Sequence, residues 1–305
     1  LLLSIALSLP MTACSEKSIN ADIEGIGNHE KEQNNITGKV TCEGKAIANA
    51  VVSDGVEVVK TNDKGEYSFL SKKKYGYVFV SIPSGYEATM VGNQPQFFKH
   101  LSSKDTKITE KIDFSLNKVD NQKHAVLAMA DFHLAKRNND ISQFESVAAD
   151  INQTAQELRA QGYKVYGISL GDESWDGFWY SNNYGIKETF QELQKIEIPF
   201  FHCMGNHDND PYFPDDRKAE EEWIQICGPV YYSFNVGNIH YIVIDDIEYL
   251  NAGAAQGTVG KRNYNETIIP EELAWLKKDL ATIQDKNMPI MVATHAPLYS
   301  NPRLS

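Results

Sequence analysis

The chain has 305 residues, a length that is typical of about two domains. Hydrophobic residues make up 42% of it and charged residues 23%, which is ordinary for a globular protein with a buried core. The formal net charge of −12 offers no basic field for non-specific nucleic-acid binding, although bound metal ions could still attract a phosphate locally.

The amino-terminal segment has the features of an export signal. Residues 1–9 are apolar but too few for the roughly 20 residues that a membrane-spanning helix needs. Met11-Thr12-Ala13-Cys14 resembles a bacterial lipobox, which implies cleavage before Cys14 and lipidation of its sulfur; an ordinary signal peptide with a chance cysteine is the alternative. We therefore predict a partial lipoprotein signal peptide over residues 1–14 and a linker over 15–35. The protein would be exported and held in the bacterial cell envelope, periplasmic or cell-surface, by a lipid anchor at Cys14.

Residues 36–117 have the pattern of a small all-β sandwich domain. Turns at Glu43-Gly44, Asp54-Gly55 and Lys64-Gly65 separate short strands, for example over residues 56–60, 67–70 and 77–82. The run from Asn62 to Phe69 resembles a hairpin of carboxypeptidase-regulatory-like domains, which implies a seven-stranded, prealbumin-like module. No catalytic constellation is visible there, so we interpret the domain as a spacer or docking domain.

The cysteines other than Cys14 do not form a recognisable framework. Cys42, Cys203 and Cys227 are odd in number and widely spaced, and no C-x-x-C pair indicates structural zinc. Cys203 lies in an apolar run and is predicted to be a buried hydrophobic residue.

After a polar linker over residues 118–123, strands alternate with helices from residue 124 to 305. Ser142 and Glu145 form a capping-box pattern before an apolar stripe, and Gly162 follows it. The stripe consists of Phe144, Ala148, Ile151, Ala155 and Leu158. A second helix is predicted from Pro270, with the stripe Leu273, Leu276, Leu280 and Ile283. Residues 231–236 and 239–244 read as a hairpin around Gly237-Asn238, so we expect an α/β domain with mixed sheets.

Four polar segments in this domain each follow an apolar run. The segments are Asp131-Phe132-His133, Gly171-Asp172, Gly205-Asn206-His207-Asp208 and Thr294-His295, and the runs are 125–130, 165–170, 198–204 and 289–293. Ligand sites of open α/β sheets assemble at the carboxyl ends of strands, so the four segments can converge. Asp131, His133, Asp172, Asn206 and His295 offer mixed oxygen and nitrogen ligands, which suit Mn, Fe or Zn better than Mg or Ca. His202 and His240 are interpreted as strand residues instead.

In this order the segments resemble the calcineurin-like metallophosphoesterase superfamily, whose pattern is D-x-H, G-D, G-N-H-[DE], H and G-H-x-H. The resemblance implies a four-layer α/β-β/α core and two divalent metal ions. By position, Asp131 and His133 would bind the first metal and Asp172 would bridge. Asn206 and His295 would bind the second metal, while His207 would be the catalytic histidine and Asp208 its partner.

The function implied is hydrolysis of phosphoesters by a metal-bridging hydroxide. The substrate could be a phosphomonoester or a phosphodiester. The alternative is a surface binding protein with a degenerate phosphoesterase domain. Substrate and oligomeric state do not follow from the residues.

Departures from this pattern argue against two branches of the superfamily, the purple acid phosphatases and the protein Ser/Thr phosphatases. His133 and Trp175 replace the glycine and tyrosine of purple acid phosphatases, and Trp175 replaces an acid of protein phosphatases. The aromatic run Trp175, Phe178, Trp179 and Tyr180 could wall a substrate pocket or simply pack. No G-H-x-H occurs, so we expect a longer protein whose present segment is impaired in catalysis.

Overall fold

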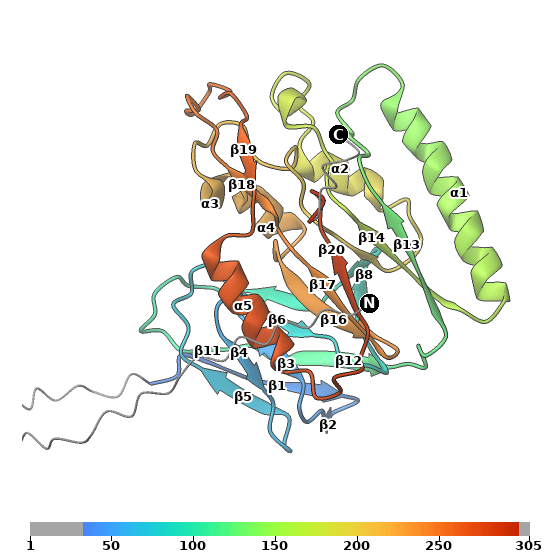
Figure 1. Ribbon diagram of the computed structural model, residues 1–305, viewed down its shortest axis with the longest axis vertical. Helices are drawn as coiled ribbons and strands as arrows, with labels where there is room; N and C mark the ends of the chain where they lie inside the picture. The colour runs from blue at the N-terminus through green and yellow to red at the C-terminus, as the bar shows by residue number, and fades with distance from the viewer. Residues whose placement is uncertain (1–32, 299–305) are drawn as a thin grey trace, which may run out of the picture. The chain divides into compact units, whose positions relative to one another are not determined.

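The computed structural model describes residues 33–298, which belong to one compact unit (Figure 1). The predicted lipobox at Cys14 lies outside these residues. Within them a β-rich N-terminal region precedes a mixed α/β region, as the sequence predicts. None of the helices in residues 33–298 is long and apolar enough to cross a membrane.

The N-terminal region is a sandwich of two sheets with a small extra hairpin. The larger sheet contains β1 (Ile36–Cys42), β2 (Lys45–Ala46), β5 (Glu66–Phe69), β7 (Tyr86–Ala88), β11 (Glu110–Lys111) and β12 (Phe114–Lys118). The second sheet contains β3 (Val51–Ser53), β4 (Val58–Lys60), β6 (Tyr77–Ser81) and β10 (Phe98–His100). The hairpin pairs β8 (Met90–Val91) with β9 (Gln94–Pro95). The region is all-β as predicted, but its strands are shorter and more numerous than in a seven-stranded module.

The α/β region is built on two three-stranded sheets. The first is parallel and contains β13 (His124–Met129), β14 (Lys164–Ser169) and β15 (Phe200–Phe201). The second contains β16 (Tyr232–Val236), β17 (Ile239–Val243) and β20 (Ile290–Ala293), with β17 and β20 parallel. A small sheet pairs β18 (Ile247–Tyr249) with β19 (Tyr264–Glu266). The helices are α1 (Asp140–Ala160), α2 (Ile186–Leu193), α3 (Asp216–Ala219), α4 (Glu221–Ile226), α5 (Pro270–Leu280) and the 3₁₀ turn η1 (Asp176–Phe178).

The two sheets face each other through a shared core, with helices on the outer sides. Phe201 of β15 stacks on Phe234 of β16 with ring centroids 3.8 Å apart. Helix α1 lies along the first sheet and α5 lies on the opposite side of the region (Figure 1). The four-layer architecture is therefore confirmed, and so is the hairpin β16–β17 around Gly237-Asn238.

The apolar runs formed strands, and of these β14 and β15 are almost completely buried, as parallel strands covered on both faces are, whereas β13 and β20 lie at sheet edges and are partly exposed. Three of the four strands, β13, β14 and β20, match the predicted runs within a residue or two. The fourth is shorter, since β15 covers only Phe200–Phe201 and the chain leaves the strand at His202. Each polar segment consequently lies at or shortly after the carboxyl end of a strand.

Helix α1 has the predicted apolar stripe but not the predicted cap. Phe144, Ala148, Ile151 and Ala155 are its buried residues. The helix begins at Asp140, and Ser142 lies inside it with its hydroxyl donating to the carbonyl oxygen of Asn139. The capping-box prediction was wrong because Asp140 accepts hydrogen bonds from the backbone of Ala135 and Arg137, which starts the helix earlier.

Helix α5 begins at Pro270 as predicted, but it buries a different face. Leu273 and Leu280 are exposed, whereas Trp275 is completely buried. The indole of Trp275 packs on Tyr231 and Phe79, and Asp279 of the same face accepts hydrogen bonds from Ser233. The predicted leucine stripe was right only for Leu276, which packs against the core, because the helix buries mainly the aromatic and polar face that contains Trp275 and Asp279.

The N-terminal region packs tightly on the α/β region. Phe97 lies 4.7 Å from Tyr232 and 5.9 Å from Phe201 between ring centroids. The hydroxyl of Tyr231 donates to the carbonyl oxygen of Gly55 at 2.7 Å. In the segment predicted as a linker, Asn121 is fully buried and accepts from the backbone nitrogen of Gly237 at 3.1 Å. One hydrophobic core therefore runs through both regions.

An open groove lies between the free edges of the two sheets of the α/β region. It has a volume of about 610 Å³, and Val126, Tyr241 and Val292 are among its lining residues. Strands β13 and β20 each have a single neighbour within residues 33–298. Exposed side chains of β20, such as Met291, give this edge an apolar surface.

We predict that Trp275→Ala destabilises the whole unit, because Trp275 connects α5 to both regions and donates from Nε1 to Ser53 of β3 at 3.2 Å. Loss of a buried tryptophan costs about 3–5 kcal/mol of unfolding free energy. Leu273→Ala, on the exposed face of the same helix, is the control and should change it by about 0.5 kcal/mol or less. Denaturant unfolding measures both. Equal, small losses would show that the two regions do not depend on this contact.

Candidate metal centre

The loops that follow β13 and β14 run side by side at the strand ends. The backbone nitrogen of Asp131 donates to the carbonyl oxygen of Gly171 at 3.1 Å, and that of His133 donates to the carbonyl oxygen of Asp172 at 2.9 Å. The predicted convergence of the D-x-H and G-D segments therefore comes from backbone pairing that extends past the strands.

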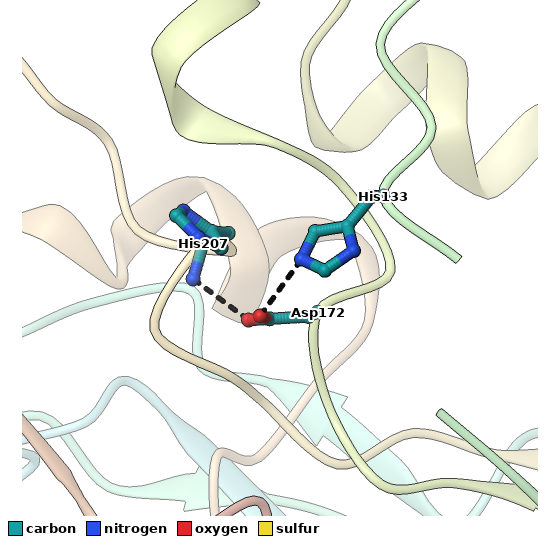
Figure 2. A group of neighbouring side chains, drawn as sticks. All are labelled: His133, Asp172 and His207. Carbon is teal, nitrogen blue, oxygen red and sulfur yellow. Dashed lines mark hydrogen bonds and ion pairs between the residues drawn. The ribbon is translucent and has the colours of Figure 1, made fainter. Parts of the chain in front are cut away.

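Asp172 lies at the centre of the converging side chains (Figure 2). Its Oδ2 is 3.0 Å from Nε2 of His133 and 3.5 Å from Nε2 of His295, while its Oδ1 accepts from the backbone nitrogen of His207 at 2.8 Å. Burial raises the pKa of the Asp172 carboxyl, but the hydrogen bonds from His133 and His207 outweigh it and hold that pKa below its usual value. Asp172 is thus an anionic group shared by three segments.

His295 and Asn206 form the other side of the site. Nε2 of His295 lies 2.9 Å from Oδ1 of Asn206, and its Nδ1 lies 2.9 Å from the carbonyl oxygen of Leu170. Since the carbonyl of Leu170 can only accept, Nδ1 carries a proton, and Nε2 is the nitrogen that points toward Asn206 and Asp172. This is the orientation that a metal-binding imidazole needs.

Three of the candidate ligands have left-handed backbone conformations. The φ angles of Asp131, His133 and Asp172 are 56°, 48° and 55°. Such angles are unfavourable for residues other than glycine and cluster at functional sites. Asp131 itself is exposed beside His133, where its charge contributes to raising the pKa of the imidazole.

Two glycines allow these loops to approach one another. A Cβ on Gly205 would lie 2.3 Å from the backbone nitrogen of Asp172, and one on Gly171 would lie 2.5 Å from Nδ1 of His295. Neither contact can be relieved by moving a flexible side-chain end. The glycines of the G-D and G-N-H-D segments therefore serve close packing around Asp172.

His207 has a different acidic partner from the one predicted. Its Nδ1 lies 2.7 Å from Oδ1 of Asp176, a completely buried residue of η1. Asp176 is held by Nη1 of Arg262 at 2.8 Å and by the hydroxyl of Tyr249 at 3.1 Å. The sequence analysis missed all three residues, although an acid four positions after Asp172 was a visible signal for Asp176.

The predicted pairing of Asp208 with His207 was wrong. The chain turns between Gly205 and Asp208, so the Asp208 carboxylate points back into the loop instead of toward the imidazole. It accepts from the backbone nitrogens of Gly205 at 2.9 Å and Ser174 at 2.8 Å. Burial, with the charges of Asp172 and Glu173, raises the pKa of this carboxyl well above its usual range. Asp208 therefore holds two loops together beneath the site.

Aromatic side chains border the histidines. The Trp175 ring lies 4.9 Å from His133 and 5.5 Å from His207 between centroids, and the guanidinium of Arg137 lies 3.9 Å from its centre. Trp179 is buried and donates from Nε1 to the Ser174 hydroxyl, so it packs inside the protein. Of the predicted aromatic run, Trp175 is thus placed to border the site and Trp179 is not.

The donor set fits divalent metal ions. One atom each from His133, Asp172 and His207 lie within 4.8 Å of one another, and Nε2 of His295 lies 3.5 Å from Asp172 and 2.9 Å from Asn206. Carboxylate and amide oxygens with imidazole nitrogens suit Mn, Fe or Zn. Without a cation, the close approach of these side chains to a buried carboxylate would serve only the fold.

Comparison with protein families agrees with this geometry. Residues 124–304 match the family model described as calcineurin-like phosphoesterase, which covers more than half of the chain. The chain belongs to the calcineurin-like phosphoesterase family. Residues 34–119 match a model described as the N terminal of calcineurin-like phosphoesterase. No curated protein matches the chain. Family membership identifies a metal-dependent phosphoesterase architecture.

We predict that metal binding releases protons from the site. The hydrogen bond to Asp172 raises the pKa of His133, so this imidazole stays protonated to a higher pH than usual and must lose its proton to bind a cation. Apparent affinity for Mn²⁺ should therefore increase as the pH rises from about 6 to about 8, the range in which imidazoles titrate. Calorimetry in two buffers of different ionisation enthalpy counts the protons. His124→Gln, away from the site, should leave the count unchanged, and a pH-independent affinity would contradict the prediction.

Proposed function

We propose that this protein hydrolyses phosphoesters at a dinuclear metal centre. Asp131 and His133 would hold one cation, Asn206 and His295 the other, and Asp172 would be shared between them. The observation that carries the proposal is the position of Asp172, whose Oδ2 approaches an imidazole from each of the two predicted ligand groups. When bound, a pair of divalent cations supplies charge stabilisation for the phosphoryl group and lowers the pKa of a bound water.

His207 is the proposed general acid. Its Nδ1 is engaged by Asp176, which leaves Nε2 as the nitrogen that can reach a substrate, and a quarter of its side chain is exposed. The carboxylate of Asp176 fixes the orientation of the ring. As an imidazolium, His207 could donate the proton on Nε2 to the leaving oxygen when the phosphorus–oxygen bond breaks.

Asp176 is proposed as a positioning residue rather than a catalytic one. It is buried and reaches substrate only through His207, while Arg262 and Tyr249 fix its two oxygens. A degenerate binding protein would have no need for this buried arrangement behind a histidine, since recognition alone requires no proton donor. The geometry therefore favours hydrolysis over binding without turnover.

We predict that Asp176→Asn lowers kcat by about 10²–10⁴-fold for an alkyl phosphoester, because a misdirected or neutral His207 cannot protonate the alkoxide. A nitrophenyl ester should lose much less, since nitrophenolate leaves without a proton. Hydrolysis of both esters with Mn²⁺ measures the difference.

The matched control is Asp279→Asn, which breaks a buried Asp–His pair remote from the site, 2.8 Å between Oδ2 of Asp279 and Nε2 of His240. In this variant the hydrolysis rates for the two esters, measured per folded molecule, should change equally and only slightly. Asp172→Asn should abolish metal binding at the dinuclear centre and both activities. Equal losses for the two esters in Asp176→Asn would contradict the role given to His207.

A further inference from the structure

A second group of potential ligands lies behind the metal centre. Glu173, His202 and Cys227 are 1%, 4% and 5% exposed and come from the loop after β14, the end of β15 and the C-terminus of α4. One ligand atom from each of the three lies within 4.8 Å of the others. The group shares no residue with the centre around Asp172, although Glu173 is its neighbour in the chain.

Polar atoms in this group lack partners within residues 33–298. Nδ1 of His202 lies 2.8 Å from Oε1 of Glu173, but its Nε2 is buried without a hydrogen bond. Nε1 of Trp223, on helix α4 just before Cys227, is also buried and unpaired. Buried polar groups are normally satisfied, so an unpaired imidazole nitrogen beside a thiol and a carboxylate needs an explanation.

A second observation concerns the partner of the buried Glu173 carboxylate. Within the described residues, the only side chain that forms an ion pair with Glu173 is His202, and that pair requires a protonated imidazole. A buried carboxylate without a full positive charge beside it is costly. A cation bound by Glu173, Cys227 and one ring nitrogen of His202 would neutralise the buried carboxylate.

We propose that Glu173, His202 and Cys227 bind a thiophilic divalent cation of the zinc class at a site separate from the dinuclear centre. Carboxylate, imidazole and thiolate are all established zinc ligands. The sulfur selects for softer metals, whereas the candidate ligands around Asp172 contain no sulfur. The sequence analysis interpreted His202 as a strand residue, because its two possible co-ligands are 29 and 25 positions away and belong to no spacing motif.

Binding at this site has a defined proton balance. Burial, followed by the charge of Glu173, raises the pKa of the Cys227 thiol well above its usual value, so the metal-free thiol keeps its proton. A metal–sulfur bond forms as the sulfur–hydrogen bond breaks, and the proton leaves to solvent. No oxidant or reductant is involved.

The site would connect three parts of the fold. Glu173 follows Asp172 directly, and its backbone oxygen accepts from the nitrogen of Leu134 in the D-x-H loop at 3.0 Å. On the other side, Nε2 of Gln94 in the N-terminal region donates to the carbonyl oxygens of Ile226 and Cys227, each at 3.0 Å. A cation here would fix the loop that carries Asp172 to α4 and to the N-terminal region.

Cobalt substitution tests the proposal without relying on activity. The full chain, carrying Cys14→Ser to remove the one thiol outside the described residues, is produced in cobalt-supplemented medium and examined by absorption spectroscopy. We expect a near-ultraviolet sulfur-to-cobalt charge-transfer band, which a centre with only oxygen and nitrogen ligands cannot give. The folded protein should retain one cobalt ion more than the Glu173→Gln, His202→Gln variant.

Cysteine variants assign the band. Cys227→Ser should lose it, whereas Cys203→Ser and Cys42→Ser, which remove the other buried thiols, should keep it. Absence of the band in cobalt-loaded, folded protein would overturn the proposal, whatever the variants do. Persistence of the band in Cys227→Ser would overturn it as well.

Discussion

The site depends on one interaction, the convergence of four loops on the buried carboxylate of Asp172. That carboxylate receives an imidazole from the D-x-H loop, a second imidazole from the loop after β20 and a backbone N–H from the G-N-H-D loop. Left-handed backbone at His133 and Asp172 and the close approach of Gly205 are conformational costs of this arrangement. Binding of two cations to the shared Asp172 carboxylate would supply free energy that offsets these conformational costs.

The N-terminal region contributes to the same arrangement through packing. Its aromatic residues join the core of the α/β region, and Phe97 contacts Phe201 at the end of the strand that leads to the G-N-H-D loop. Asn93 donates from Nδ2 to the carbonyl oxygens of Leu193 and Ile196, just before that strand. The N-terminal region is therefore more than a spacer, because it packs against the elements that carry the candidate ligands.

Much of the fold and the convergence of the candidate ligands followed from the sequence, because apolar runs predict strands and the polar segments follow them closely. The predictions that were wrong concern features that tertiary packing determines. The buried face of α5 is set by Trp275 meeting Tyr231, which periodicity does not reveal. The partner of His207 is set by the turn after Gly205, so Asp176 replaced Asp208. Glu173 and His202 are 29 positions apart and belong to no common sequence motif, so the sequence did not reveal their contact. The lipid anchor at Cys14 and the impaired catalysis remain predictions.

The most direct test of the account is electron paramagnetic resonance of the Mn²⁺-loaded protein. Two manganese ions that share the carboxylate of Asp172, about 4 Å apart as in two-metal hydrolases, should give an exchange-coupled spectrum. Asp172→Asn should abolish the coupling, while the remote Asp279→Asn should retain it. A spectrum of isolated Mn²⁺ ions at every metal loading of the folded protein would contradict a dinuclear centre built around Asp172.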